Sequence, residues 1–262
     1  MIQKRATEFR KARQNELLRL ASVLENRNLV RDSQPLRSAA ALCVKRDVKN
    51  GEEFWGYNFD SLEFTKFDDE SFRHSRPENS VIDSLELGMT LSGPCLDDNA
   101  PDNPFIELNG DIVVSGLTAD GEKTLKCAWH LDKHIRDEKS AEPTLVHPEY
   151  HFQHGGKNVR LLDNYGSHQI LESPRIAHPP LDAILFVDFI LSNYCGTEWK
   201  SLRMEDSTYK ELVVSSQERC WAPYALATAV VSKTITSTSP WPAKEIWPQL
   251  LIDRVILEKS DT

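Results

Sequence analysis

Apolar residues recur at steps of three and four positions along the start of the chain, with Lys, Arg and Glu between them. These positions are Ile2, Ala6, Phe9, Leu17, Leu20, Ala21 and Leu24. Because one helical turn takes about 3.6 residues, this spacing brings them to one face of a helix. The pattern predicts an amphipathic helix from Ile2 to about Leu29, and we take residues 1–34 as a basic N-terminal segment.

After Pro35 the period changes to two, which is typical of strands with one buried face. The alternating segments are Ala40–Val44, Trp55–Phe59, Leu62–Phe64 and Leu85–Leu91. Turn-forming residues fill Gly93–Pro104, which predicts an acidic loop there. We expect one further strand from Phe105 to Leu117, with a tight turn or bulge at Asn109-Gly110.

One more strand precedes a dense group of histidines. Its alternating apolar residues are Leu125, Cys127 and Trp129. Since successive side chains of a strand point to opposite faces, His130 points away from the core if these three residues face it.

Beyond Tyr165 the pattern becomes helical. A helix starting at Pro179 and continuing to about Tyr194 is apolar on nearly all sides, so we expect it to be buried. Asp206 or Ser207 caps a second helix that runs to about Cys220. The segment Tyr224–Ile235 fits a helix or a strand, and a last helix with Trp247 is expected from Pro242.

This order of elements predicts an α+β fold. Residues 35–262 form one domain, with a largely antiparallel β-meander over about 38–130 and a His/Pro-rich loop region over about 130–178. Helices over about 179–258 follow. Strands and helices occupy separate parts of the chain, so the helices are expected to pack on one face of the sheet.

Charge is unevenly distributed. The chain has a net charge of −9, yet residues 1–50 hold 12 Lys and Arg against 5 Asp and Glu. The N-terminal helix could contact an acidic protein or nucleic-acid phosphates, or it could lie against the acidic remainder of its own chain. The net charge disfavours nonspecific nucleic-acid binding. The candidate contact residues of this helix are Lys4, Arg5, Arg10, Lys11 and Arg13.

Several function classes are excluded by what the sequence lacks. The longest apolar run, Ala183–Leu191, is interrupted by Asp188 and is shorter than the roughly 18 residues of a membrane-spanning helix. No phosphate-binding glycine motif occurs, which disfavours nucleotide binding. The N-terminus does not resemble a secretory signal, and the five cysteines form no CxxC pair. We therefore expect a cytoplasmic protein without membrane contact.

Seven of the eight histidines lie between His130 and His178. His130 and His134 are four residues apart, a spacing that lets two imidazoles on a helix reach one ion, although Leu131 stands where a metalloprotease motif has glutamate. Pro148 and Gly155-Gly156 indicate a loop around the next group of histidines. The candidate ligands for a zinc-type divalent ion are His130, His134, His151 and His154.

A second group of residues suggests acid–base chemistry. Asp188 lies inside an apolar helix, where an ionised carboxylate needs a partner such as Arg175, His178 or a more distant histidine, or else its pKa rises. Asp182 sits in the first helical turn, where the helix dipole favours it. A buried aspartate that orients a histidine is one way to assemble a general base. The candidate catalytic residues are Asp188, His178 and Glu149, and the candidate nucleophiles are Ser173, Ser192 and Cys195.

Two functional classes follow. The first is an intracellular, non-catalytic subunit or binding module that contacts a protein through its basic helix and through Tyr150 and Phe152, since aromatic side chains often anchor interfaces. The second is a metal-dependent or His/Asp-assisted hydrolase with its site in residues 130–188. One zinc ion per chain would favour the enzyme, and a stable hetero-complex without zinc would favour the subunit.

A third and weaker alternative comes from topology. The order of an N-terminal helix, a meander, a Pro-rich loop and C-terminal helices is similar to that of ubiquitin-conjugating-like domains, which would give Cys195 the position of the reactive cysteine. The residues around Cys195 do not resemble the active-site sequence of that family.

Overall fold

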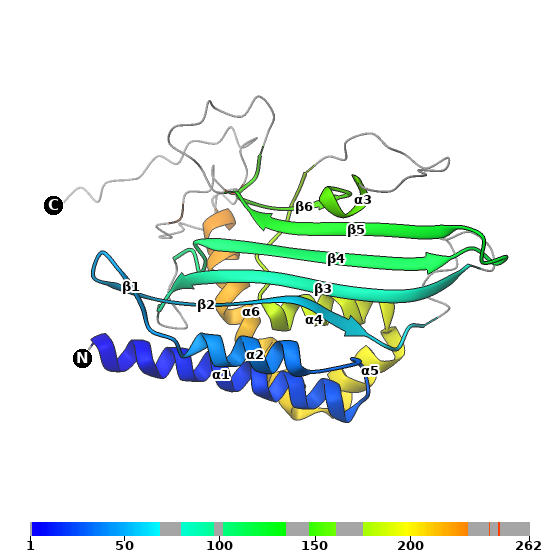
Figure 1. Ribbon diagram of the computed structural model, residues 1–262. Helices are drawn as coiled ribbons and strands as arrows, with labels where there is room; N and C mark the ends of the chain where they lie inside the picture. Colours follow the sequence, from blue (N-terminus) through cyan, green and yellow to red (C-terminus); the bar gives the residue numbers. More distant parts are fainter. Residues whose placement is uncertain are drawn as a thin grey trace.

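Antiparallel strands follow one another in chain order through a single sheet, β1 to β7 (Figure 1). This computed structural model describes residues 2–68, 80–96, 102–134, 147–160 and 175–229, together with Trp241 and Ile246. Within these residues the strands are β1 (Asp47–Lys49), β2 (Glu52–Phe64), β3 (Val81–Pro94), β4 (Glu107–Leu117), β5 (Thr124–Lys133), β6 (Tyr150–His154) and β7 (Ile176–Ala177). The helices are α1 (Ile2–Asn26), α2 (Gln34–Cys43), α3 (Lys157–Arg160), α4 (Ala183–Tyr194), α5 (Gly196–Glu205) and α6 (Ser207–Thr228).

The predicted α+β fold is confirmed. N-terminal and C-terminal helices meet the same face of β2, where the Phe9 ring of α1 packs edge-on against Trp55 with ring centroids 5.5 Å apart. On the same face the backbone N–H of Ala183 in α4 donates to the hydroxyl of Tyr57 at 3.0 Å. The opposite face of the sheet is left for polar side chains, as is common in antiparallel sheets.

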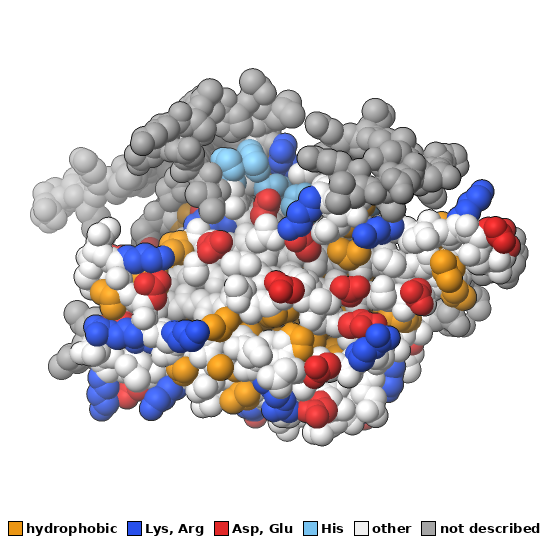
Figure 2. Space-filling model, in the orientation of Figure 1, with side chains coloured by type: hydrophobic (Ala, Val, Ile, Leu, Met, Phe, Trp, Pro, Cys, Tyr) orange, Lys and Arg blue, Asp and Glu red, His pale blue; other side chains and the backbone are white. Residues whose placement is uncertain are grey.

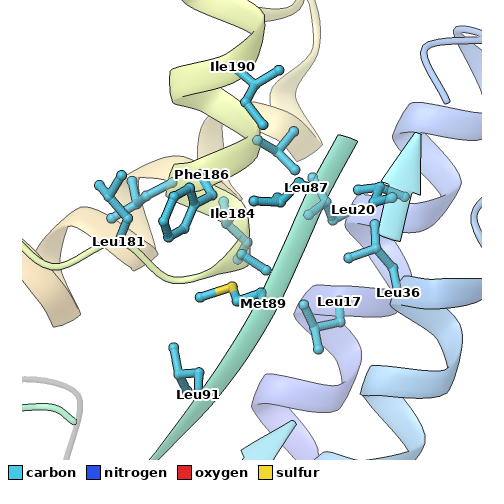
Figure 3. Close-up of a cluster of buried hydrophobic side chains, with 14 of the residues drawn as sticks. Leu17, Leu20, Leu36, Leu87, Met89, Leu91, Leu181, Ile184, Phe186 and Ile190 are labelled. Carbon is cyan, nitrogen blue, oxygen red and sulfur yellow. The ribbon is translucent and has the colours of Figure 1, made fainter. Parts of the chain in front are cut away.

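One hydrophobic core joins the sheet to both groups of helices (Figure 3). Leu87 and Met89 of β3 lie between Phe186 of α4 on one side and Leu20 of α1 on the other. All four residues are at most 3% exposed. The N-terminal helix is therefore held by apolar contacts as well as by its charges.

The strand expected at Ala40–Val44 is wrong, because this segment forms the last turn and C-cap of α2, and the sheet begins at Asp47. Pro35 lies in the first turn of α2, where its missing N–H costs nothing. The buried residues of α2 are Leu36, Ala39, Ala40 and Cys43. These four positions recur at helical steps of three and four residues. The competing period-two pattern rests on only three apolar residues, Ala40, Leu42 and Val44, so it was the weaker signal.

The turn or bulge expected at Asn109-Gly110 is also wrong, since β4 pairs with β3 and β5 through both residues without a register shift. Gly110 serves packing instead. A Cβ atom at this position would lie 2.2 Å from Cζ of Phe186. The lack of a side chain therefore lets α4 approach the sheet.

The loop expected around His151 and His154 is a strand, β6. Tyr150 and Phe152 are buried and alternate with polar residues, but the run is too short to stand out beside Pro148 and the paired glycines. The structure thus gives two of the candidate ligands fixed positions on the sheet.

The C-terminal helices match the expectations in part. α4 begins at Ala183 rather than Pro179, with Asp182 as its N-cap, and α6 begins after the predicted cap Asp206. The helix α5 between them was not predicted. Residues 230–235, and 242–258 except Ile246, lie outside the described part of the chain. Within the described residues no helix is both long and apolar enough to cross a membrane.

Candidate metal centre

Neighbouring strands β5 and β6 carry polar side chains on the face turned away from the helices. Asp132 pairs with His151, and His130 pairs with Gln153. Leu131, which lies between His130 and Asp132, is buried in the core. Because side chains alternate along a strand, its two neighbours point outward, which confirms the direction predicted for His130. Figure 2 shows a group of histidine side chains, in pale blue, near one edge of this face.

Three of these side chains converge. His130, Asp132 and His151 each offer one ligand atom, and these atoms lie within 4.8 Å of one another. Nε2 of His151 is 3.0 Å from Oδ1 of Asp132, and Nε2 of His130 is 3.9 Å from Oδ2. The arrangement comes from the pairing of β5 with β6, not from a helical four-residue spacing.

The tautomer of His151 follows from its second nitrogen. Nδ1 lies 3.2 Å from the backbone carbonyl of Pro148, and a carbonyl can only accept, so Nδ1 carries the hydrogen. Burial lowers the pKa of His151 to about 4, which keeps the ring neutral at neutral pH. Its Nε2 therefore presents a bare lone pair to Asp132.

Oδ1 of Asp132 is buried and accepts no hydrogen bond from the described residues, even though Nε2 of His151 is so close. With Nδ1 of His151 as the donor to Pro148, Nε2 and an ionised Oδ1 are both acceptors, so the short distance brings two lone pairs together. Such a contact repels unless a proton or a cation lies between the atoms. The same burial raises the pKa of the Asp132 carboxyl, against the opposing effect of nearby imidazoles and Arg175.

Further imidazoles extend the cluster. The rings of His147 and His151 have centroids 4.6 Å apart, and His134 stacks on His147 at 3.9 Å. Burial, followed by the neighbouring histidines, lowers the pKa of His147 to about 4. His134 thus joins the group through His147 and not as one of the three converging ligands.

The turn after β6 shapes the site. Gly155 and Gly156 both have positive φ, a conformation that favours glycine. A Cβ at Gly156 would lie 3.2 Å from Nδ1 of His130. Gly156 therefore allows the backbone to pack directly on the His130 ring.

The fourth predicted ligand, His154, lies on the opposite face of the sheet. Its ring packs edge-on against Trp129 with centroids 5.0 Å apart. His178 is likewise on the core side, 4.8 Å from the Phe152 ring, and its Nδ1 lies 2.6 Å from the carbonyl oxygen of Pro179. Neither residue meets the three converging ligands.

Glu149 has a structural role. Its carboxylate accepts hydrogen bonds at 2.6 Å from Asn103 and from the indole N–H of Trp241, and Lys133 lies 3.3 Å away. These donors occupy both carboxylate oxygens, so the geometry lends no support to Glu149 as a catalytic base.

The expected partner of Asp188 was wrong. Arg203 of α5 binds this carboxylate with two hydrogen bonds, of 2.6 and 3.0 Å, in place of Arg175 or His178. Two further donors, the indole of Trp199 and the hydroxyl of Tyr209, each lie 2.9 Å away. Trp199 and Arg203 stand four residues apart, and that spacing is the signal that could have predicted both α5 and its role.

The candidate nucleophiles find no activating base among the described residues. Cys195 is buried, its thiol donates to the carbonyl of Lys66, and its pKa is raised to about 12, chiefly by burial. The hydroxyl of Ser192 donates to the backbone of Phe189. Ser173 lies outside the described residues. A reactive thiolate at Cys195, as in the ubiquitin-conjugating alternative, is therefore disfavoured.

Most of the predicted partner-contact residues are buried. Tyr150 and Phe152 belong to the core. Arg10 forms a 2.8 Å ion pair with Glu53, and Arg13 forms one of 2.7 Å with Glu16. The exposed members of the predicted set are Lys4, Arg5 and Lys11.

Comparisons of the chain with family models, with curated proteins and with solved structures found no match.

Proposed function

We propose that the protein binds one divalent ion of the zinc class through His130, Asp132 and His151. The observation that carries this proposal is the acceptor Nε2 of His151, 3.0 Å from a buried carboxylate oxygen that accepts no hydrogen bond from the described residues. A cation between these atoms turns a repulsive contact into two coordinate bonds.

The chemistry of the donors fits this ion. Zinc binds imidazole nitrogen and carboxylate oxygen at about 2.0–2.2 Å, so tetrahedral ligand atoms lie roughly 3.4 Å apart. Nε2 of His151 and Nε2 of His130 lie 3.0 and 3.9 Å from different oxygens of Asp132, which is close to that separation, and the three ligand atoms all lie within 4.8 Å of one another. The hydrogen bond from Nδ1 of His151 to Pro148 is the kind of outer contact that orients a metal-binding histidine.

Three protein ligands leave the fourth tetrahedral position open, as in catalytic zinc sites. This favours the metal-dependent hydrolase among the functions that the sequence suggested. A zinc ion held by these residues would lower the pKa of a bound water to about 7, so activating that water near neutral pH would not need a strong base. The other roles of Glu149 and Asp188 are therefore compatible with this function.

A non-catalytic binding module has less support. Arg10, Arg13, Tyr150 and Phe152 are buried, which leaves Lys4, Arg5 and Lys11 for contact with a protein partner or nucleic acid. A stable hetero-complex on co-purification, without bound metal, would favour this function. For either function we propose a reducing, cytoplasmic location, because all five cysteines are free.

Metal titration of the full-length chain tests the proposal. Cobalt(II) in a tetrahedral site absorbs visible light strongly, and calorimetry with zinc gives the stoichiometry. We expect one ion per chain. Asp132→Asn and His130→Gln should weaken binding by about a hundredfold or more, since outer-sphere partners alone are worth roughly 10–100-fold.

His154→Gln is the matched control, because His154 is a histidine of the same region on the opposite face of the sheet. It should leave metal affinity unchanged. Failure to bind one ion, or an equal loss in the control variant, would overturn the proposal and leave a shared proton as the link between His151 and Asp132.

A further inference from the structure

Arg175 lies beside the proposed metal ligands. It directly precedes β7, in which Ile176 pairs with Phe152 and Ala177 with His151. Continuing this antiparallel register puts Arg175 opposite Gln153, which itself pairs with His130. Arg175 therefore lies on the outward face, in one row with His130, while Ala177 adds only a methyl group beside His151.

Among the described residues, the Nε of Arg175 is buried without a hydrogen-bond partner. Within the same residues, Arg175 forms no ion pair with a carboxylate. Its positive charge is one of the effects that lower the pKa values of Asp132, His147 and His151. A partly buried arginine of this kind needs an acceptor, and the described residues supply none within hydrogen-bonding distance of Nε.

The charges of the occupied site can be added up. A divalent ion, the Asp132 carboxylate and the Arg175 guanidinium together leave two positive charges, because the histidines are neutral. A cation placed near an arginine is repelled by it, so a ligand that binds both must be anionic. Phosphate and phosphate monoesters carry a charge of about −1.5 to −2 at pH 7, which balances the two positive charges of the site better than the single charge of a carboxylate.

We propose that the open position of the metal centre takes the phosphate group of its ligand, with one oxygen on the ion and others on the guanidinium of Arg175. This inference rests on the proposed metal site and names the class of ligand for it, phosphate or a phosphate monoester. Arginine suits this task because its planar fork of donors fits two phosphate oxygens at once.

The test uses the full-length chain loaded with cobalt(II), in which a ligand that enters the coordination sphere changes the visible spectrum. Inorganic phosphate and acetate are titrated separately at constant ionic strength. We expect a saturable change with phosphate and a change with acetate only at roughly tenfold or higher concentration. Arg175→Gln should raise the phosphate concentration that gives half of the spectral change by at least about tenfold, without weakening cobalt binding.

Lys126→Gln is the matched control. Lys126 is an exposed cation on the same face of β5, four residues before His130, so its loss removes the same charge outside the cluster. It should change phosphate binding by less than about twofold, while Arg175→Lys should recover only part of the affinity.

The outcomes separate the two proposals. If cobalt does not bind, both the metal site and this inference fail. If cobalt binds normally but phosphate leaves its spectrum unchanged, or acts equally on Arg175→Gln and the parent protein, only the inference is overturned. Equal responses to acetate and phosphate would overturn the assignment to phosphate.

Discussion

Arg219 of α6 donates a 2.6 Å hydrogen bond to the carboxylate of Asp182, the N-cap of α4. The same guanidinium lies 3.2 Å from Glu16 of α1, and Glu16 in turn pairs with Arg13. One buried cation thus links three helices that are far apart in sequence. Arg13, one of the basic residues of the N-terminal helix, is therefore paired inside the molecule.

The first prediction compares the two aspartate caps. Asp182→Ala removes a cap and leaves Arg219 buried without one of its partners, which should lower the free energy of unfolding by about 3–5 kcal/mol. Asp206→Ala removes only the cap of α6, at a cost of about 1 kcal/mol. Urea denaturation of both variants measures the difference. Equal losses would mean that the Arg219 ion pair contributes no stability.

The second prediction concerns the approach of α4 to the sheet. Gly110→Ala would put a methyl group 2.2 Å from the Phe186 ring, so we expect a loss of about 1–3 kcal/mol in stability. In the Phe186→Leu background the same substitution should cost less, because the ring edge is gone. A double-mutant cycle measures this coupling, and strict additivity would show that the two residues do not clash.

The third prediction concerns pH. Burial lowers the pKa of His178 below its usual value of 6.5, so the folded state holds its proton less tightly than the unfolded state. The stability from this residue is complete above pH 6.5 and is lost as the pH falls through the folded pKa. The His178→Gln variant lacks this titratable group. Below pH 6.5, wild type should lose stability relative to this variant, at up to about 1.4 kcal/mol per pH unit.

Urea denaturation of both proteins between pH 8 and 4, with a chelator present, makes this comparison. His147 and His151 titrate in both proteins, as does Asp132, whose raised pKa acts in the opposite direction. Their contributions cancel in the difference. A difference that does not change with pH would contradict the assigned shift at His178.

The fourth prediction concerns the paired glycines after β6. Alanine at either position is strained because φ is positive, so both variants should lose stability. Only Gly156→Ala also presses on the His130 ring, whereas a Cβ at Gly155 meets nothing within 4 Å. Zinc affinity should therefore fall in Gly156→Ala alone. An equal fall in both variants would assign the effect to the turn and not to His130.

Period-two and 3.6-residue patterns predicted the long elements correctly, including the amphipathic α1 and the strands around Tyr57 and Leu87. Each of these elements buries a face along many residues, so its period is repeated often enough to be read. The pattern failed for α2 and β6, where only a few residues carry it. The partner of Asp188 was missed for another reason, because Arg203 lies on a helix that was not predicted.

By itself, the sequence determined the class of fold, the one-sided polarity of the sheet and the stretch that holds most histidines. These properties depend on the order of apolar and polar residues within each element, because each helix or strand buries its residues with a fixed period. Only the tertiary structure decided that Asp132 and His151 face each other, that His154 lies on the other side of the sheet, and that Asn103 and Trp241 bond the carboxylate of Glu149. Strand register sets these contacts between distant segments, and a shift of β6 by one residue would turn His151 to the opposite face, away from His130 and Asp132.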